Sequence, residues 1–118
     1  MRALILIAHG SRRADSNDEV RALAAALEAQ LADRYQQVLP AFLELAEPSI
    51  PGAIDAVIAA GAREVVVLPY FLAAGNHVVN DVPALVAERQ QAHPEVTLRL
   101  LPHLGASPQL PALLAALV

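Results

Sequence analysis

Four short apolar runs alternate with amphipathic stretches from one end of the chain to the other. Each run has the length of a β-strand, and the runs occupy residues 2–8, 38–45, 64–70 and 96–101. Short connections between alternating strands and helices favour a parallel sheet, because parallel strands are joined by right-handed crossovers. We therefore predict one α/β domain over residues 1–118, with a four-stranded parallel sheet of order 2-1-3-4 and helices on both faces.

The first two helices are predicted from the residues at their ends. Ser16 and Glu19 have the spacing of a capping box, which would start a helix that runs to about residue 33. A second helix follows Ser49 and is expected to stop at Gly61.

The second half of the chain continues the alternation. A third helix is predicted over residues 82–91, and a last helix is predicted to have Ser107 as its cap and Pro108 at its first position. Pro40 lies near the start of the second strand. Because proline cannot donate a hydrogen bond to a neighbouring strand, we expect this strand at an edge of the sheet.

The composition is unusually apolar for a chain of this length. Hydrophobic residues make up 56% of the chain and charged residues only 17%. A subunit interface would cover this apolar surplus, so we expect a homo-oligomer. The net charge is −4, every basic residue is an arginine, and the sequence has no basic run. These properties argue against a nucleic-acid partner.

The chain has no cysteine, which excludes disulfides, thiolate metal sites and iron–sulfur clusters. This composition fits a reducing compartment. The apolar run at residues 3–8 is too short to span a membrane, and it leads into His9 without a cleavage pattern. We interpret it as a buried strand and expect a cytoplasmic protein that does not associate with membranes.

Polar residues that can bind a ligand follow the predicted strands. His9 comes after the first strand and Glu44 lies at the carboxyl end of the second. Asn76 and His77 lie in the loop after the third strand, and His103 follows the fourth. In an open parallel sheet, ligands bind beyond the carboxyl ends of the strands. We therefore expect these side chains at one end of the sheet.

The side chains of His9, Glu44 and His77 make two imidazoles and one carboxylate. This set suits Fe, Co, Ni or Zn and leaves coordination positions open, whereas a closed structural zinc site would need four ligands. Each residue also has a purely structural explanation. Either histidine could make a hydrogen bond at a strand end, and Glu44 could be an edge-strand carboxylate in solvent, since burying it unpaired would be costly.

Other residues of these loops have two interpretations each. Gly10 and Gly75 are candidates for a positive φ beside a ligand or a turn. Ser11 and Arg12 could bind an anion or simply solvate their loop. His93 is expected at the surface, where it closes the third helix.

Three segments occur in the order of a known pattern. They are residues 6–12, with the turn His9-Gly10-Ser11-Arg12, residues 41–50 around Glu44, and residues 68–83 around His77. On these residues, the sequence resembles the short class II tetrapyrrole chelatases, the sirohydrochlorin cobaltochelatases and ferrochelatases. The resemblance covers nearly the whole chain and implies a chelatase-like fold, similar to the flavodoxin-like one.

The resemblance also implies a reaction and a site. His9 and His77 would flank the metal and the macrocycle, and Glu44 would match the acidic residue of the family's central strand. The residues implied to border the substrate are Gly10, Ser11, Arg12, Gly75 and Asn76. The implied substrates are Co²⁺, Fe²⁺ or Ni²⁺ and sirohydrochlorin, a planar macrocycle with eight carboxylates, and the products lead to sirohaem or cobalamin.

Two features set this chain apart from the family that it resembles. Members often carry basic residues just after the second histidine, where Val79 and Asn80 stand here. Arg12, Arg13 or arginines of a partner subunit would have to supply that positive charge. Other members are about twice as long and are built from two such domains, so the resemblance implies a homodimer whose cleft is lined by both subunits.

Metal insertion requires the ion to shed water, the ring to lose two pyrrole protons, and the two to meet face to face. Imidazoles would hold the ion and a histidine or glutamate would accept the protons, so no organic cofactor is expected. Three alternatives remain. One is a non-catalytic metal or tetrapyrrole carrier, and another is a flavodoxin-like binding module. The third is a phosphoryl-transfer enzyme related to the histidine phosphatases, which place an arginine before the histidine where this chain has Ala8.

Overall fold

The four predicted strands form one sheet in the computed structural model, which describes the backbone of residues 1–118 and every side chain except that of His77. The strands are β1 (Arg2–Ala8), β2 (Gln37–Phe42), β3 (Glu64–Pro69) and β4 (Thr97–Leu100). All neighbouring strands are parallel, and their order is β2-β1-β3-β4. The predicted fold class and strand order are confirmed, and Pro40 lies in an edge strand as expected.

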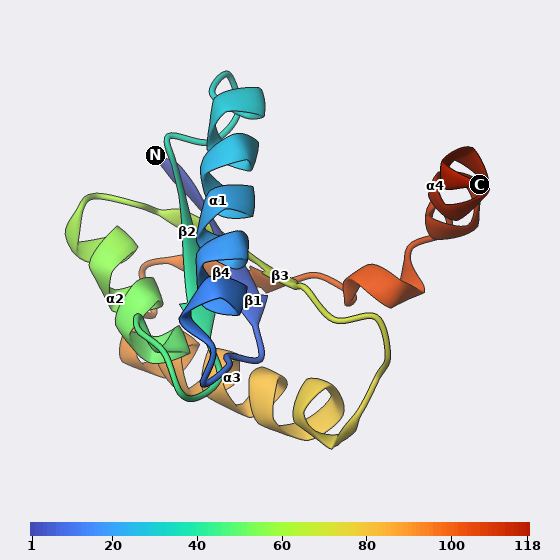
Figure 1. Cartoon of the computed structure of the whole chain (residues 1–118). Helices are drawn as coiled ribbons and strands as arrows, with labels where there is room; N and C mark the ends of the chain where they lie inside the picture. Colours follow the sequence, from blue (N-terminus) through green and yellow to red (C-terminus); the bar gives the residue numbers. More distant parts are fainter.

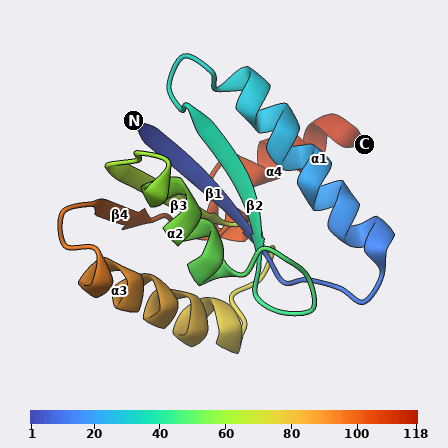
Figure 2. The same ribbon diagram turned by 90° about the vertical axis from the view of Figure 1, so that its left-hand side faces the viewer.

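Helices lie on both sides of this sheet. They are α1 (Ala14–Gln30), α2 (Ile50–Ala59), α3 (Val82–Ala92) and α4 (Leu110–Leu117), with a π-helix η1 (His77–Asp81) before α3 and a 3-10 turn η2 (Leu104–Ala106) before α4. Figures 1 and 2 show α1 on one face of the sheet, and α2 with α3 on the other. No helix in the described part of the chain is long and apolar enough to cross a membrane.

The central strand β1 explains why the chain forms three layers. Its side chains alternate between the two faces, so Ile5 and Ile7 pack with α2 and α3, whereas Leu4 and Leu6 pack with α1. All four are buried. A strand that is apolar on both faces is stable only between two helical layers, and its carboxyl end is thereby fixed at a defined position.

The first helix does not begin where the sequence predicted. It starts at Ala14 and ends at Gln30, and the residue that precedes it, Arg13, makes no side-chain cap hydrogen bond. The capping box of Ser16 and Glu19 is therefore wrong. Ser16 already lies inside the first turn, where its amide donates to the carbonyl of Arg13 at 3.1 Å, so it is not the residue that precedes the helix.

The ends of α2 and α4 show one confirmed cap and one correction. Ser49 caps α2, since its hydroxyl accepts a hydrogen bond from the amide of Gly52 at 3.1 Å. The chain leaves α2 through Gly61, whose φ is +112°. Ser107 does not cap α4, which begins three residues later at Leu110. The Ser107 hydroxyl instead accepts a hydrogen bond from the Gln109 amide within a turn.

Candidate metal-insertion site

The loops after β1 and β2 are joined backbone to backbone. The amide of Leu43 donates to the carbonyl of Ala8 at 3.0 Å, and the amide of Glu44 donates to the carbonyl of His9 at 3.1 Å. Strand β2 itself ends at Phe42, so Glu44 lies in the loop and not in the strand. The two loops therefore extend the pairing of the strands just far enough to bring His9 and Glu44 together.

Gly10 makes this close approach sterically feasible. Its φ is +95°, and a Cβ added there would lie 1.8 Å from the carbonyl oxygen of Glu44. Glycine is the one residue without a Cβ, so it alone allows the two backbones to pass at this distance. The sequence prediction of a positive φ at Gly10 is confirmed.

His9 and Glu44 form a polar pair at the carboxyl end of the sheet. The Nε2 of His9 lies 3.2 Å from Oε1 of Glu44, and about half of each side chain is exposed, 49% and 54%. The ring of Phe71 meets the His9 ring edge to face, with centroids 6.4 Å apart. The pair is thus fixed at the carboxyl end of the sheet, with about half of each side chain exposed to solvent.

A buried asparagine fixes the loop that carries His9. The side-chain oxygen of Asn17 accepts from the amide of Ser11 at 3.0 Å, and its nitrogen donates to the carbonyl of Ser11 at 2.8 Å. Asn17 is 6% exposed and is the only buried polar residue among the described side chains. We did not predict this role. The sequence did offer a signal for it. Asparagine side chains often bind nearby backbone groups, and Asn17 lies in the first turn of a helix, directly after a polar turn.

An arginine of α1 holds the loop that carries Glu44. The guanidinium of Arg21 lies 5.1 Å from the centre of the Phe42 ring and donates to the carbonyl of Glu47 at 3.0 Å. The amide of Phe42 donates to the carbonyl of Pro48, so the loop closes on itself. Both loops of the candidate site are therefore fastened to α1.

A hollow of about 480 Å³ opens beside Glu44. Its lining comes from the loop after β2, the end of η1 and α3, and consists of Leu43, Glu44, Asp81, Ala84, Leu85 and Glu88. Because η1 runs directly into α3, the backbone at His77 is one turn before Asp81. The side chain of His77 lies outside the described residues, so its part in a ligand set stays a prediction. Among the side chains that the structure describes, no group of three His, Asp or Glu residues could hold a metal ion.

The remaining predicted residues lie around this end of the sheet. Arg12 is exposed, and Ser11 is partly buried and accepts from the amide of Arg13 through its hydroxyl. Asn76 is exposed and accepts a hydrogen bond from Asn80. Gly75 has a φ outside the positive range, and no described atom lies within 4 Å of a Cβ built there, so the expectation of a strained glycine at this position is wrong.

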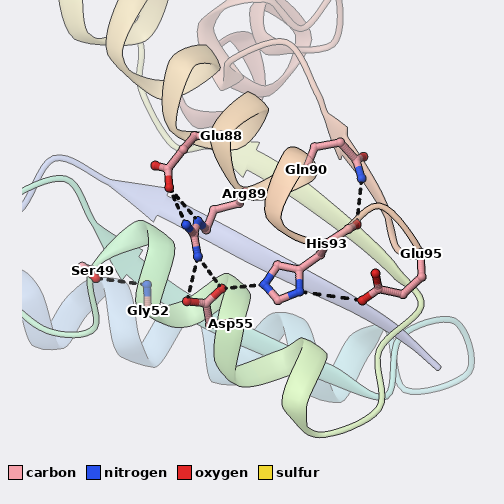
Figure 3. Close-up of polar contacts among 8 residues, drawn as sticks. All are labelled: Ser49, Gly52, Asp55, Glu88, Arg89, Gln90, His93 and Glu95. Carbon is pink, nitrogen blue, oxygen red and sulfur yellow. Dashed lines mark hydrogen bonds and ion pairs between the residues drawn. The ribbon is translucent and has the colours of Figure 1, made fainter.

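His93 closes α3 as predicted, but its side chain is only 24% exposed and not fully at the surface. Its Nε2 lies 3.0 Å from Asp55 of α2, and its Nδ1 lies 3.8 Å from Glu95 (Figure 3). Arg89, which also pairs with Glu88, donates to both oxygens of Asp55 at 3.1 Å. This network joins α2 to α3. The sequence could not indicate it, because Asp55 and His93 lie far apart along the chain.

Burial and the charged partners of Asp55 act on its pKa in opposite directions. Partial burial would raise the pKa of the Asp55 carboxyl, but the hydrogen bonds from His93 and Arg89 outweigh it and hold that pKa below its usual value. The pKa of Arg89 is raised, most strongly by its hydrogen bond to Glu88 and next by its hydrogen bond to Asp55. The network thus joins α2 to α3, and one of its residues, Glu88, also lines the hollow beside Glu44.

Comparisons with known proteins agree on one family. The sequence pattern of the CbiX family matches residues 3–118. A sirohydrochlorin cobaltochelatase of Methanococcus maripaludis is 42% identical over 86 residues, which are 73% of this chain and 58% of that protein. The chain thus spans little more than half the length of this relative.

Two solved structures are similar in fold and sequence. A crystal structure of a putative cobalamin biosynthesis CbiX protein from Marinobacter aquaeolei VT8 has a TM-score of 0.80 and 31% identity, and it covers 99% of this chain and 93% of that one. The sirohydrochlorin chelatase SirB from Bacillus subtilis subspecies spizizenii, in complex with cobalt, has a TM-score of 0.76 and 27% identity. It covers 84% of this chain and 42% of that one.

Proposed function

Because this chain belongs to the CbiX family, we propose that it inserts a divalent metal, cobalt or ferrous iron, into sirohydrochlorin or a closely related tetrapyrrole. The observation that carries the proposal is the pair of His9 and Glu44, 3.2 Å apart at the carboxyl end of a parallel sheet. The similarity to named sirohydrochlorin chelatases and to a cobalt complex supports the substrate class.

The spacing of this pair suits one shared metal ion. Bonds from imidazole nitrogen and carboxylate oxygen to a divalent ion such as zinc are about 2.1 Å long. Two atoms 3.2 Å apart would then meet the ion at an angle of roughly 100°, between the octahedral and tetrahedral values. His77 is our candidate for the third ligand, and the remaining positions would stay open for the nitrogens of the ring.

Removal of the pyrrole protons requires a base beside the ion. Glu44 and the histidines are the candidates, since a carboxylate or a neutral imidazole accepts a proton near neutral pH. A metal ion that binds His9 must displace any proton on its Nε2, and Glu44 lies within reach of that proton. We therefore propose that His9 binds the metal and that Glu44 acts as ligand or proton acceptor.

The exposure of the site supports a cleft that a second subunit completes. Half of each side chain of the pair faces outwards, whereas metal insertion needs the ion and the ring held in register with water excluded. We propose that two copies of the chain face each other across the macrocycle. Arg12 is exposed near the site and would meet the carboxylates of the substrate.

An anaerobic absorbance assay tests the proposed function. Sirohydrochlorin in at least tenfold excess over protein is mixed with Co²⁺, Fe²⁺ or Ni²⁺, and the change in the tetrapyrrole spectrum is followed against the same mixture without protein. We expect many equivalents of metallated product with cobalt or iron. A spectral change that stops at one equivalent would instead identify a carrier of the same fold.

A further inference from the structure

The loop between β2 and α2 contains the one residue other than glycine with a left-handed backbone in the described part of the chain. Leu45 has a φ of +67°, and it directly follows Glu44. The Cβ of an L-residue disfavours this conformation by about 5- to 30-fold in population. The Leu45 side chain is 55% exposed, so its packing offsets little of that cost. Contacts elsewhere must therefore hold the loop in this shape.

Both ends of this loop meet at the same residue. The loop leaves β2 at Phe42 and comes back to it, since the amide of Phe42 donates to the carbonyl of Pro48 at 2.9 Å. Figure 2 shows the loop closing beyond the tip of β2. Its first half is held by the loop after β1, because the amide of Glu44 donates to the carbonyl of His9 at 3.1 Å. The chain therefore reverses between Glu44 and Pro48, and the left-handed backbone of Leu45 lies in this reversal.

The returning half of the loop is held by a side chain of α1. The Nη2 of Arg21 donates to the carbonyl of Glu47 at 3.0 Å, and its guanidinium carbon lies 5.1 Å from the centre of the Phe42 ring. Its Nη1 donates to Asp18, one turn earlier on α1, at 2.9 Å. Among the described side chains outside the loop, Arg21 is the one that hydrogen-bonds to the returning half.

An arginine suits this position because its guanidinium is planar and carries donors in a fixed fork. It can therefore donate to a carboxylate and a carbonyl at once while its face covers an aromatic ring. That ring belongs to Phe42, which is 1% exposed and so gives the guanidinium a fixed base. Asn17, one turn before Arg21, holds the loop that carries His9. Residues four apart lie on one face of a helix, so a single face of α1 holds both loops of the site.

We propose that Arg21 is a positioning residue of the metal-insertion site, which offsets the strain at Leu45 and thereby keeps Glu44 beside His9. Without the guanidinium, the loop would relax to a right-handed backbone at Leu45. Glu44 is the preceding residue, so its carboxylate would then leave its place 3.2 Å from His9. The effect on the rate rests on the proposed function, whereas the loop geometry does not depend on any reaction.

Amide hydrogen exchange of the full chain, followed by NMR, tests the loop without any substrate. The Phe42 amide can exchange only when its hydrogen bond to Pro48 opens. We expect Arg21→Ala to speed this exchange by at least about 10-fold. Adding Leu45→Gly to the same chain should restore most of the protection, because glycine has no penalty at a positive φ.

A second glycine variant is the matched control for this rescue. Ala46→Gly adds the same flexibility at the next residue, whose φ is not positive, and should restore no protection to the Arg21→Ala chain. Unchanged exchange of the Phe42 amide in Arg21→Ala would overturn the inference. Equal restoration by Leu45→Gly and Ala46→Gly would overturn it too, because flexibility rather than strain would then explain the rescue.

Single-turnover insertion of Co²⁺ into sirohydrochlorin connects the loop to the site. Arg21→Ala should slow insertion by about 10-fold or more per folded molecule, and Leu45→Gly in the same chain should recover at least about threefold of that loss. A residue that only stabilised the fold would show no such recovery, because the rate is expressed per folded molecule. Arg34→Ala also removes a guanidinium from an aromatic ring, that of Tyr35 before β2, and should leave the rate unchanged.

The two experiments separate a failure of this inference from a failure of the proposed function. A natural chain that inserts no metal would contradict the proposed function, and the exchange of the Phe42 amide would still decide whether Arg21 holds the loop. A natural chain that inserts metal, with an Arg21→Ala rate that is normal or that Leu45→Gly does not raise, would overturn the inference and leave the proposed function standing.

Discussion

Replacement of Gly10 by alanine should disrupt the candidate site far more than it disrupts the fold. The new Cβ would lie 1.8 Å from the carbonyl oxygen of Glu44, whereas ordinary contact begins at 3.4 Å. The loop of Glu44 must therefore retreat by about 1.6 Å, the difference between these distances. Metal sites tolerate changes in ligand position of only about 0.2 Å, so the pair of His9 and Glu44 should no longer fit one ion.

The size of each effect follows from the geometry. An alanine at a φ of +95° costs about 1–2 kcal/mol, and the displaced loop adds about 1–3 kcal/mol. A shift of about 1 Å at a reacting centre can cost about 100-fold in rate. We expect Gly10→Ala to fold, to lose a few kcal/mol of stability, and to insert metal at least about 100-fold more slowly.

Gly61 offers a matched control for backbone strain. Its φ is +112°, yet the nearest atom to an added Cβ is the Met1 sulfur at 4.0 Å, and the residue lies at the other end of the sheet. Gly61→Ala should lose about 1–2 kcal/mol in urea unfolding and keep its rate per folded molecule. If Gly10→Ala and Gly61→Ala had equal rates of metal insertion under single-turnover conditions, the reasoning from loop contact to site geometry would be refuted.

Two further predictions concern the supports of the site. Asn17→Ala removes both hydrogen bonds to the backbone of Ser11, so urea unfolding should show a loss of about 1–3 kcal/mol in stability. Metal insertion per folded molecule should also be slower. An unchanged rate would show that the loop does not need this support. Asp55→Asn should cost about 1 kcal/mol at pH 7, since Asp55 is partly exposed. Because the pKa of the Asp55 carboxyl is lowered on folding, its contribution to stability is present above the ordinary pKa of 3.8 and is lost as the pH falls through the folded pKa. The difference between Asp55→Asn and the natural protein should therefore shrink at pH 3, and a difference that is the same at both pH values would contradict this.

The sequence was sufficient to predict the order of the strands and the approach of His9 to Glu44. Both follow from the same physical rule, since neighbouring parallel strands present their carboxyl ends at one edge. The apolar pattern located each strand to within a few residues. It could not show that β2 ends at Phe42, because Leu43 continues the apolar run while its backbone already leaves the strand.

Other features depend on contacts that a linear pattern does not contain. Asn17 lies within the predicted first helix, but its side-chain amide binds the backbone of Ser11, which the turn at Gly10 brings within reach. His93 gains its partner Asp55 only when α2 and α3 pack together. The sequence predicted a last helix, but not that its residues Leu113, Leu114 and Leu117 would stay exposed within the chain.

Single-turnover insertion of cobalt into sirohydrochlorin by histidine variants tests the central claim most directly. Each variant is mixed anaerobically, in excess, with the tetrapyrrole and Co²⁺, and the rate is expressed per folded molecule from circular dichroism. We predict that His9→Ala and His77→Ala each lose most of the rate, whereas His93→Ala loses stability through Asp55 and keeps its rate. Near-normal insertion by His9→Ala or by His77→Ala would contradict the assignment of that histidine to the metal.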